Sequence, residues 1–404
     1  MSILIMTPFA LAASPRPPIA LQPYGLPTYR SAHDAVMDLA ADDAIFALYP
    51  RRIARAAQTF LTGFPGKVLY AVKANPHPAL MRVLYDEGVR HFDVASIREI
   101  DLVAALCPDA RMFLMHPIKS RATIQQAYAR GVRDFSFDHA DELQKIWDCT
   151  QGATDLNLYL RLALPQDNKT GSGAVMPLSG KFGASAQEAI ELLRAARPHA
   201  QRLGLCFHVG SQCIDLSSYD CAISYARTIV DAAGVEIDML DVGGGFPVAY
   251  PGMPTPPMIE YFAAIRDSVS AHGFDDIELL GEPGRALCAE GGSTLVRVEL
   301  RKGTDLYIND GTYGSLFDAG QFAWKFPVCL LRNGPPEPAS NTVGFRFFGP
   351  TCDSSDTMIG PFHLPADTGE GDWIEVQHLG AYGQALTTRF NGFYSDHTVA
   401  ILED

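Results

Sequence analysis

Short apolar runs alternate with helix-like segments from about residue 45 to residue 290, and this alternation limits the possible folds more than any other feature. Such alternation favours parallel strands joined by helices. About eight units in roughly 240 residues fit an α/β protein with a TIM-like (β/α)8 barrel better than an open doubly wound sheet. The strand-like runs cover 45–49, 68–72, 91–94, 112–115, 134–137, 157–162, 203–208, 239–242 and 277–280, and the helix-like segments include 78–87, 97–106, 120–129, 140–149, 186–197 and 218–233.

The pattern changes after residue 290, where helical periodicity almost disappears. We therefore expect a barrel over residues 45–290, a β-rich domain over 291–404, and an N-terminal arm, residues 1–44, that packs with the β domain. The apolar segment 3–13 of the arm lacks a basic flank and is too short to span a bilayer, so we interpret it as a strand or arm. The strand-like runs of the second domain are 294–300, 306–309, 342–348 and 373–377.

Composition excludes several classes of function. The formal net charge is −14 and the chain has no lysine or arginine run, so we expect no nucleic-acid partner. The eight cysteines form no CxxC pair and follow no regular spacing, which predicts neither a metal site nor a disulfide framework. We therefore expect a protein of the reducing cytoplasm without a membrane partner.

Lys73 follows the apolar run 68–72 and precedes Ala74-Asn75-Pro76, which neither extends a strand nor opens a helix cleanly. The sequence thus places one amine at the mouth of a barrel strand. Most lysines are solvated surface charges, but a lysine at the end of an apolar strand loses water. Its pKa is then expected to fall, which would let it attack a carbonyl.

Two glycine-containing turns after later strands predict a phosphate site. Gly243, Gly244 and Gly245 follow the run 239–242 and would bring successive backbone N–H groups to an anion. A lone triple glycine is more often a flexible turn. Phosphate sites, however, commonly lie at the late strands of a (β/α)8 barrel, and a second turn follows at 281–285.

Side chains at other strand ends suit the remaining parts of a phosphorylated aldehyde. Glu282 would keep a pyridine nitrogen protonated, or else pair with Arg285. His208 is assigned to stack on the ring and Ser211 to bind the phosphate, although a histidine that closes a strand is more often structural. Arg161 is placed near a phenolic oxygen or in an ion pair at the core edge. With Lys73, this set predicts pyridoxal 5'-phosphate as the cofactor.

Further candidates lie near the C-terminus. Cys352 is followed by two nearby acids, so its thiol could return a proton to a substrate carbon, while Asp353 could pair with a distant ammonium. A lone cysteine in a loop is otherwise a structural thiol. Tyr382 offers a phenol that could reach the phosphate, although a buried aromatic beside glycines is the commoner explanation.

These motifs together resemble those of the fold type III pyridoxal-phosphate decarboxylases, most closely the ornithine decarboxylase branch of the ornithine, diaminopimelate and arginine decarboxylases. The similarity runs from about residue 45 onward. It is carried by Tyr70-Ala71-Val72-Lys73-Ala74-Asn75, Phe92-Asp93-Val94-Ala95-Ser96, His208-Val209-Gly210-Ser211, residues 243–245, Glu282-Pro283-Gly284-Arg285, Asn309-Asp310-Gly311-Thr312-Tyr313-Gly314, Cys352-Asp353 and Asn391-Gly392-Phe393.

The resemblance implies an N-terminal barrel, a β-barrel-like second domain and a head-to-tail homodimer with two shared active sites. Lys73 would hold the cofactor aldehyde covalently. Tyr313, Cys352 and Asp353 would arrive from the partner subunit, so an isolated monomer would be inactive. The cofactor would be bound from one subunit by Asp93, His208, Ser211, Gly244, Gly245, Glu282, Gly284, Arg285 and Tyr382.

The expected substrate is a basic L-amino acid, most closely L-ornithine, which would yield putrescine for polyamine biosynthesis. Asp353 resembles the diamine-forming branch, since diaminopimelate decarboxylases have glutamate after the cysteine. Asp318 is a candidate second acid for the distal ammonium, although it lies closer to Tyr313 than in the familiar eukaryotic pattern. Lysine is the nearest rival substrate, alone or with ornithine. An amino-acid racemase and a non-catalytic homologue are further alternatives.

Overall fold

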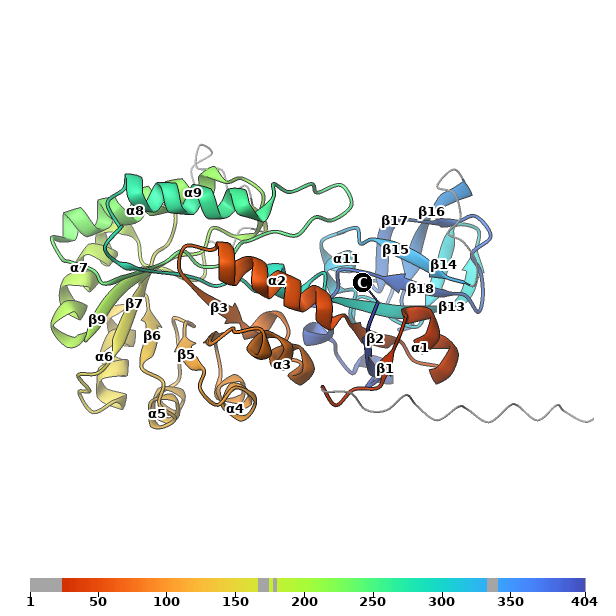
Figure 1. Cartoon of the computed structure of the whole chain (residues 1–404), viewed down its shortest axis with the longest axis horizontal. Coiled ribbons are helices and arrows are strands. Elements are labelled where there is room, and N and C mark those ends of the chain that lie inside the picture. Colours follow the sequence, from red (N-terminus) through yellow and green to blue (C-terminus); the bar gives the residue numbers. More distant parts are fainter. Residues whose placement is uncertain (1–23, 166–173, 177–179, 333–340, 404) are drawn as a thin grey trace, which may run out of the picture.

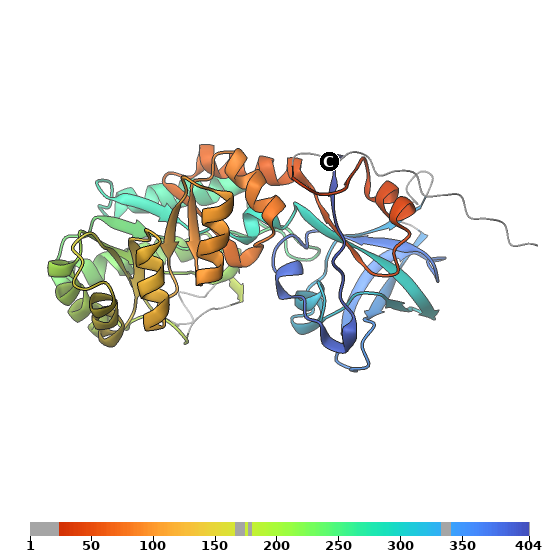
Figure 2. The same cartoon turned by 90° about the horizontal axis from the view of Figure 1, so that it is seen from below.

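The computed structural model describes residues 24–165, 174–176, 180–332 and 341–403. A barrel and a β-rich domain lie side by side along the long axis of the molecule (Figure 1), and the view from below shows the same separation (Figure 2). The segment 3–13, interpreted above as a strand or arm, lies outside the described residues. No helix in the described part of the chain has the length and apolar character needed to cross a membrane.

Eight parallel strands close into a barrel, because β11 pairs with both β12 and β9. All eight lie at runs predicted from the sequence, within one or two residues. The apolar runs become strands because a parallel barrel buries both strand faces. The strands are β3 (Lys67–Ala71), β4 (His91–Val94), β5 (Arg111–Leu114), β6 (Asp134–Phe137), β7 (Asn157–Arg161), β9 (Arg202–Cys206), β11 (Met239–Asp241) and β12 (Glu278–Gly281).

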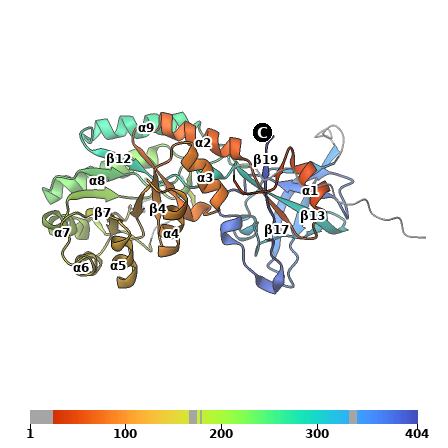
Figure 3. The same ribbon diagram turned by 60° about the horizontal axis from the view of Figure 1, so that its bottom comes forward.

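Helices surround the barrel, as Figure 3 shows for α4 to α9. Several begin at the polar caps that the sequence supplies. Ser96, for example, accepts a hydrogen bond from the N–H of Glu99 at 3.3 Å, which satisfies an otherwise unpaired helix donor. The helices of this unit are α2 (Pro50–Gly63), α3 (Pro78–Asp86), α4 (Ile97–Leu106), α5 (Arg121–Ala129), α6 (Ala140–Cys149), α7 (Ala186–Ala196), α8 (Ser217–Ala233), α9 (Met258–Ala271) and the short α10 (Arg285–Cys288). Two strands outside the barrel, β8 (Ala174–Met176) and β10 (Ser211–Cys213), pair antiparallel as a separate small sheet.

The second unit is built on a nine-stranded sheet in the order β1-β19-β2-β13-β14-β16-β17, in which β18 also pairs with β13 and β15 pairs with β18. The helix α1 packs on it through Ala35 and Val36, which share a buried cluster with Leu295 and Val399. The elements are β1 (Thr28–Tyr29), α1 (Ala32–Leu39), β2 (Ile45–Leu48), β13 (Gly292–Lys302), β14 (Asp305–Ile308), α11 (Phe317–Gln321), β15 (Val328–Leu331), β16 (Thr342–Phe348), β17 (Thr357–Pro365), β18 (Trp373–Val376) and β19 (Thr398–Ile401).

The placement of the first predicted strand is wrong. Residues 45–48 form β2, but β2 pairs with β13 and β19 in the sheet of the β domain rather than with a barrel strand. All four residues of β2 are buried, and a fully apolar run carries no alternation that would distinguish a barrel strand from a strand inside another sheet. The barrel therefore begins at β3, and the chain reaches it through α2.

Candidate active site

A cavity of about 690 Å³ lies at the carboxyl ends of the barrel strands and continues to residues of the β domain. This is the end at which (β/α)8 barrels place their active sites. The cavity brings together most of the residues singled out in the sequence. Those that line it are Lys73, Asp93, Arg161, His208, Ser211, Gly244, Gly245, Glu282, Gly284, Arg285, Asp318 and Tyr382.

Lys73 lies in a short 3-10 turn directly after β3, and 51% of its side chain is exposed at the cavity. Its Nζ is 3.7 Å from Oδ2 of Asp93, a buried residue of the neighbouring strand β4. Burial alone would lower the pKa of Lys73, but Asp93, Tyr382 and Glu282 together outweigh burial and raise it above its ordinary value. The predicted fall of this pKa is therefore wrong, because the ends of neighbouring strands carry carboxylates that stabilise the protonated amine.

Glu282, directly after β12, lies in a cluster of buried carboxyl groups. Burial, Asp241 and Asp93 together raise the pKa of Glu282 well above its ordinary value. The alternative pairing of Glu282 with Arg285 is not found among the described residues, since Arg285 pairs with Asp318 instead. Asp241 is fully buried beside Glu282, and a side-chain hydrogen bond with Glu282 opposes the rise that burial causes in the pKa of Asp241. This carboxyl cluster suits a cationic group such as a protonated pyridine nitrogen.

His208 follows β9 and holds a fixed orientation, because its Nδ1 accepts a hydrogen bond from the N–H of Gly210 at 3.0 Å. Burial, Arg161 and Lys73 lower the pKa of His208 well below its ordinary value. The imidazole is therefore neutral at physiological pH, and a neutral ring suits the predicted stacking on an aromatic cofactor. Ser211 begins β10 and lines the same cavity.

Two of the three consecutive glycines line the cavity. A Cβ on Gly244 would lie 2.8 Å from the carbonyl oxygen of Glu282, so the close approach of these two backbones requires glycine. No acceptor for the N–H of Gly244 or Gly245 is found among the described residues, and these groups suit a phosphate. The prediction is wrong for Gly243, whose N–H donates to Oδ1 of Asp241 at 2.8 Å and is not available to an anion.

Arg285 starts α10 and is held between aromatic rings. Its guanidinium carbon lies 4.6 Å from the ring centroid of Trp324 and 5.0 Å from that of Tyr382. Its Nη1 donates to Tyr250 Oη at 3.2 Å and to Asp318 Oδ2 at 3.4 Å. Its Nε is buried and has no partner in the described part of the chain. A fixed cation with unused donors suits a phosphate.

Asp318, the predicted second acid for the substrate, lies at the start of α11 and is buried. Burial raises the pKa of Asp318, and Arg285 opposes this effect. The carboxylate is thus already engaged by a guanidinium, and its contact with a substrate stays a prediction. Tyr382 reaches the cavity because its backbone N–H donates to the carbonyl oxygen of Ala74 at 2.8 Å, which ties it to the turn that carries Lys73.

Cys352, Asp353 and Tyr313 do not line this cavity and form a separate cluster on the β domain. Tyr313 Oη donates to Asp353 Oδ2 at 2.6 Å, and the N–H of Cys352 donates to Asn391 Oδ1 at 3.1 Å. Cys352 is exposed. The resemblance assigned these residues to the site of a partner subunit, and their position outside their own chain's cavity agrees with that assignment without testing it.

Sequence reasoning missed His116, which lines the cavity beside Lys73 and Asp93. The sequence could have indicated His116, because it lies two residues after β5, the same offset at which His208 follows β9. Tyr250 and Trp324 were also missed. They hold Arg285 through contacts between segments far apart in sequence, for which no local pattern exists.

Residues 50–289 match the family model described as pyridoxal-dependent decarboxylase, pyridoxal binding domain. The chain is 34% identical over 348 residues to the lysine/ornithine decarboxylase of Selenomonas ruminantium, covering 83% of this chain and 84% of that protein. The solved lysine/ornithine decarboxylase of Vibrio vulnificus, complexed with putrescine, superposes with a TM-score of 0.77 at 29% identity, covering 91% of this chain and 96% of the other.

A relative named antizyme inhibitor 2, from Xenopus laevis, is 31% identical over 383 residues, covering 87% of this chain and 79% of that protein. Overall similarity of sequence therefore extends beyond proteins named as decarboxylases. The residues that line the cavity, rather than the degree of identity, must decide between an enzyme and a binding protein.

Proposed function

Because the chain belongs to the pyridoxal-dependent decarboxylases and is a carboxy-lyase that uses pyridoxal 5'-phosphate, we propose that it decarboxylates L-ornithine to putrescine. The observation that carries the proposal is Lys73, which lies at the end of a barrel strand in a cavity that also offers a buried carboxyl cluster and a glycine turn. When bound, pyridoxal phosphate supplies the electron sink that accepts the electrons released as carbon dioxide leaves.

The residues of the cavity fit each part of this cofactor. Lys73 would hold the aldehyde and Glu282 would keep the proton on the ring nitrogen. His208 would lie against the ring face, and Arg161 would lie near the phenolic oxygen. Ser211, Gly244, Gly245, Gly284, Arg285 and Tyr382 would hold the phosphate.

We assign the remaining groups to a second copy of the chain. In a head-to-tail homodimer, Cys352 of one subunit would return a proton to the substrate carbon in the other subunit's cavity. Asp353 would pair with the distal ammonium of the substrate, and Tyr313, which donates to that carboxylate, would orient it. The exposure of Cys352 and its absence from its own chain's cavity support this arrangement. The predicted cytoplasmic location and a role in polyamine synthesis belong to the same proposal.

Lysine is the closest alternative substrate, and the names of the lysine/ornithine decarboxylases that resemble this chain favour it. Ornithine and lysine differ by one methylene group, which a binding pocket distinguishes by only about 1 to 3 kcal/mol. We therefore expect measurable turnover of both amino acids.

The experiment supplies the purified protein and pyridoxal phosphate with ornithine, lysine, arginine and diaminopimelate in separate reactions. Products are identified by mass and carbon dioxide is measured. Putrescine with an equal amount of carbon dioxide supports the proposal. Racemised amino acid without carbon dioxide would favour a racemase, and no product from any of the four would favour a non-catalytic homologue.

A further inference from the structure

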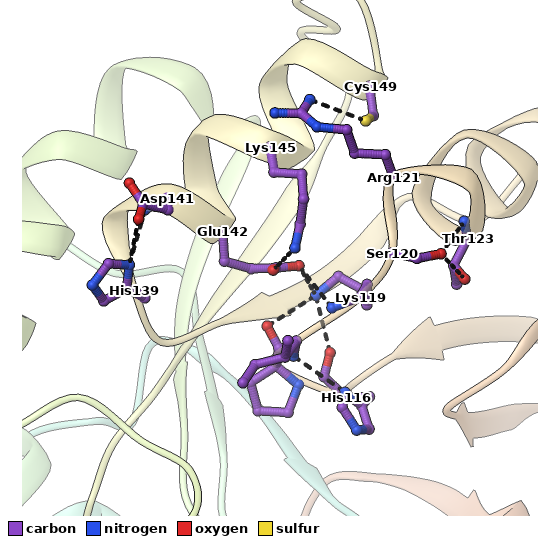
Figure 4. Close-up of polar contacts among 12 residues, drawn as sticks. His116, Lys119, Ser120, Arg121, Thr123, His139, Asp141, Glu142, Lys145 and Cys149 are labelled. Atoms are coloured by element: carbon purple, nitrogen blue, oxygen red, sulfur yellow. Dashed lines mark hydrogen bonds and ion pairs between the residues drawn. The ribbon is translucent and has the colours of Figure 1, made fainter.

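Lys119 carries a buried ammonium group that the proposed reaction does not use. It lies in the loop between β5 and α5 (Figure 4). Its side chain is only 1% exposed. Its Nζ donates to the backbone carbonyl oxygens of His116 at 2.9 Å, Pro117 at 3.3 Å and Ser136 at 2.5 Å. Burial of an ammonium costs several kcal/mol, so this group must be held by strong acceptors.

Glu142 of α6 completes the arrangement. Its Oε1 lies 3.1 Å from Nζ of Lys119 and also accepts the backbone N–H of Lys119 at 3.1 Å. Its other oxygen pairs with Lys145, one turn further along the helix, as Figure 4 shows. Ser136 belongs to β6, so the ammonium of Lys119 ties the loop after β5 to a neighbouring strand and to the helix that follows that strand.

The loop fixed in this way carries His116 into the wall of the cavity. The Nδ1 atom of His116 accepts a hydrogen bond from the N–H of Ile118 at 3.1 Å, so the neutral ring carries its proton on Nε2. The ring packs edge-on against Phe182, with 5.3 Å between centroids. No acceptor for Nε2–H is found among the described residues. His116 therefore supplies a positioned and unused donor beside Lys73 and Asp93.

We propose that His116 binds a carboxylate oxygen of the amino-acid substrate through Nε2–H and that Lys119 is the positioning residue that holds His116 in place. The inference rests on the proposed function, because it assumes an amino acid in this cavity. A carboxylate is the group that the amino acid has and the product diamine lacks. Loss of His116 should therefore weaken the binding of ornithine but leave the binding of putrescine unchanged.

The test uses the purified holoenzyme, L-ornithine and putrescine. His116→Ala is expected to raise the KM for ornithine by about tenfold, the loss of one hydrogen bond to a charged group. It should leave the inhibition constant of putrescine and the dissociation constant of the cofactor unchanged. An equal rise in the inhibition constant of putrescine would overturn the assignment. A protein that binds the cofactor but decarboxylates none of the four amino acids would refute the proposed function instead.

The role of Lys119 is tested by a double-mutant cycle. Lys119→Met is expected to raise the KM for ornithine in the wild-type background and to add almost nothing in the His116→Ala background. Lys145→Ala is the matched control, because Lys145 pairs with Glu142 but touches none of the three carbonyl groups. If the KM of the double variant rises by the product of the two single-variant factors, the positioning role of Lys119 would be contradicted. If Lys119→Met does not fold, Lys119→Gln retains two donors, and failure of both variants to fold would assign Lys119 to stability alone.

Discussion

The Nζ atom of Lys73 lies 3.7 Å from Oδ2 of Asp93, so the amine at the mouth of one barrel strand is paired with a carboxylate of the next strand. Lys73 is protonated in the free protein, because Asp93, Tyr382 and Glu282 raise its pKa despite burial. A protonated amine cannot attack an aldehyde. Capture of the cofactor therefore requires a proton to leave this pair first.

Asp93→Asn should make that proton easier to remove. An opposite charge at this distance typically shifts a pKa by about one to three units, so loss of Asp93 lowers the pKa of Lys73. The rate at which the free protein gains a visible chromophore from pyridoxal phosphate should then rise at lower pH than in the wild type. Stopped-flow absorbance across a pH series measures this, and an unmoved profile would contradict the assigned pairing.

Gly244→Ala should weaken cofactor binding by tenfold or more. The new Cβ would lie 2.8 Å from the backbone oxygen of Glu282, which cannot move away as a flexible side chain would. Gly369→Ala is the matched control, because its nearest atom would be 3.8 Å away. Absorbance titration with pyridoxal phosphate gives both dissociation constants. Equal values would contradict the proposed role of Gly244 in phosphate binding.

A mixture of two inactive variants should regain activity if the sites are shared. Lys73→Ala and Cys352→Ala each disable one half of the proposed site, and removal of an acid group such as Cys352 typically costs about a hundredfold or more. Random pairing places one intact site in each mixed dimer, which predicts about a quarter of wild-type putrescine formation. Each variant incubated alone is the control, and no recovery on mixing would contradict the shared site.

His91 should make stability decrease towards acid pH. Burial, with Lys67 and Arg111, lowers the pKa of His91 to about 4 from an ordinary value of 6.5. Between these values the unfolded chain binds more protons than the folded chain, so the free energy of unfolding falls as pH falls through this window. The free energy of unfolding of His91→Asn should therefore fall by on the order of 2 kcal/mol less than that of the wild type as pH falls through this window. Urea unfolding of both proteins between pH 4 and 7 measures it, and parallel curves would contradict the prediction.

Local sequence patterns predicted the barrel because its strands are short apolar runs that end in recognisable turns. Lys73, His208 and Glu282 could be found for the same reason, since each closes such a run or follows it within two residues. The run 45–49 was misplaced because a fully apolar strand has the same pattern in a barrel and in another sheet.

Other features depend on contacts that no local pattern encodes. The pKa of Lys73 is raised by Asp93, Tyr382 and Glu282, which lie far apart in the sequence. The pairing of Arg285 with Asp318 joins the barrel to the β domain. These relationships exist only once the elements are packed.

The central claim is that one nitrogen, that of Lys73, captures the cofactor. Its most direct test is reduction of the holoprotein with borohydride, followed by proteolysis and mass spectrometry. The account predicts a phosphopyridoxyl group on the peptide that contains Lys73 and on no other lysine, with none in Lys73→Ala. An unmodified Lys73 peptide, or a label on another lysine, would contradict it.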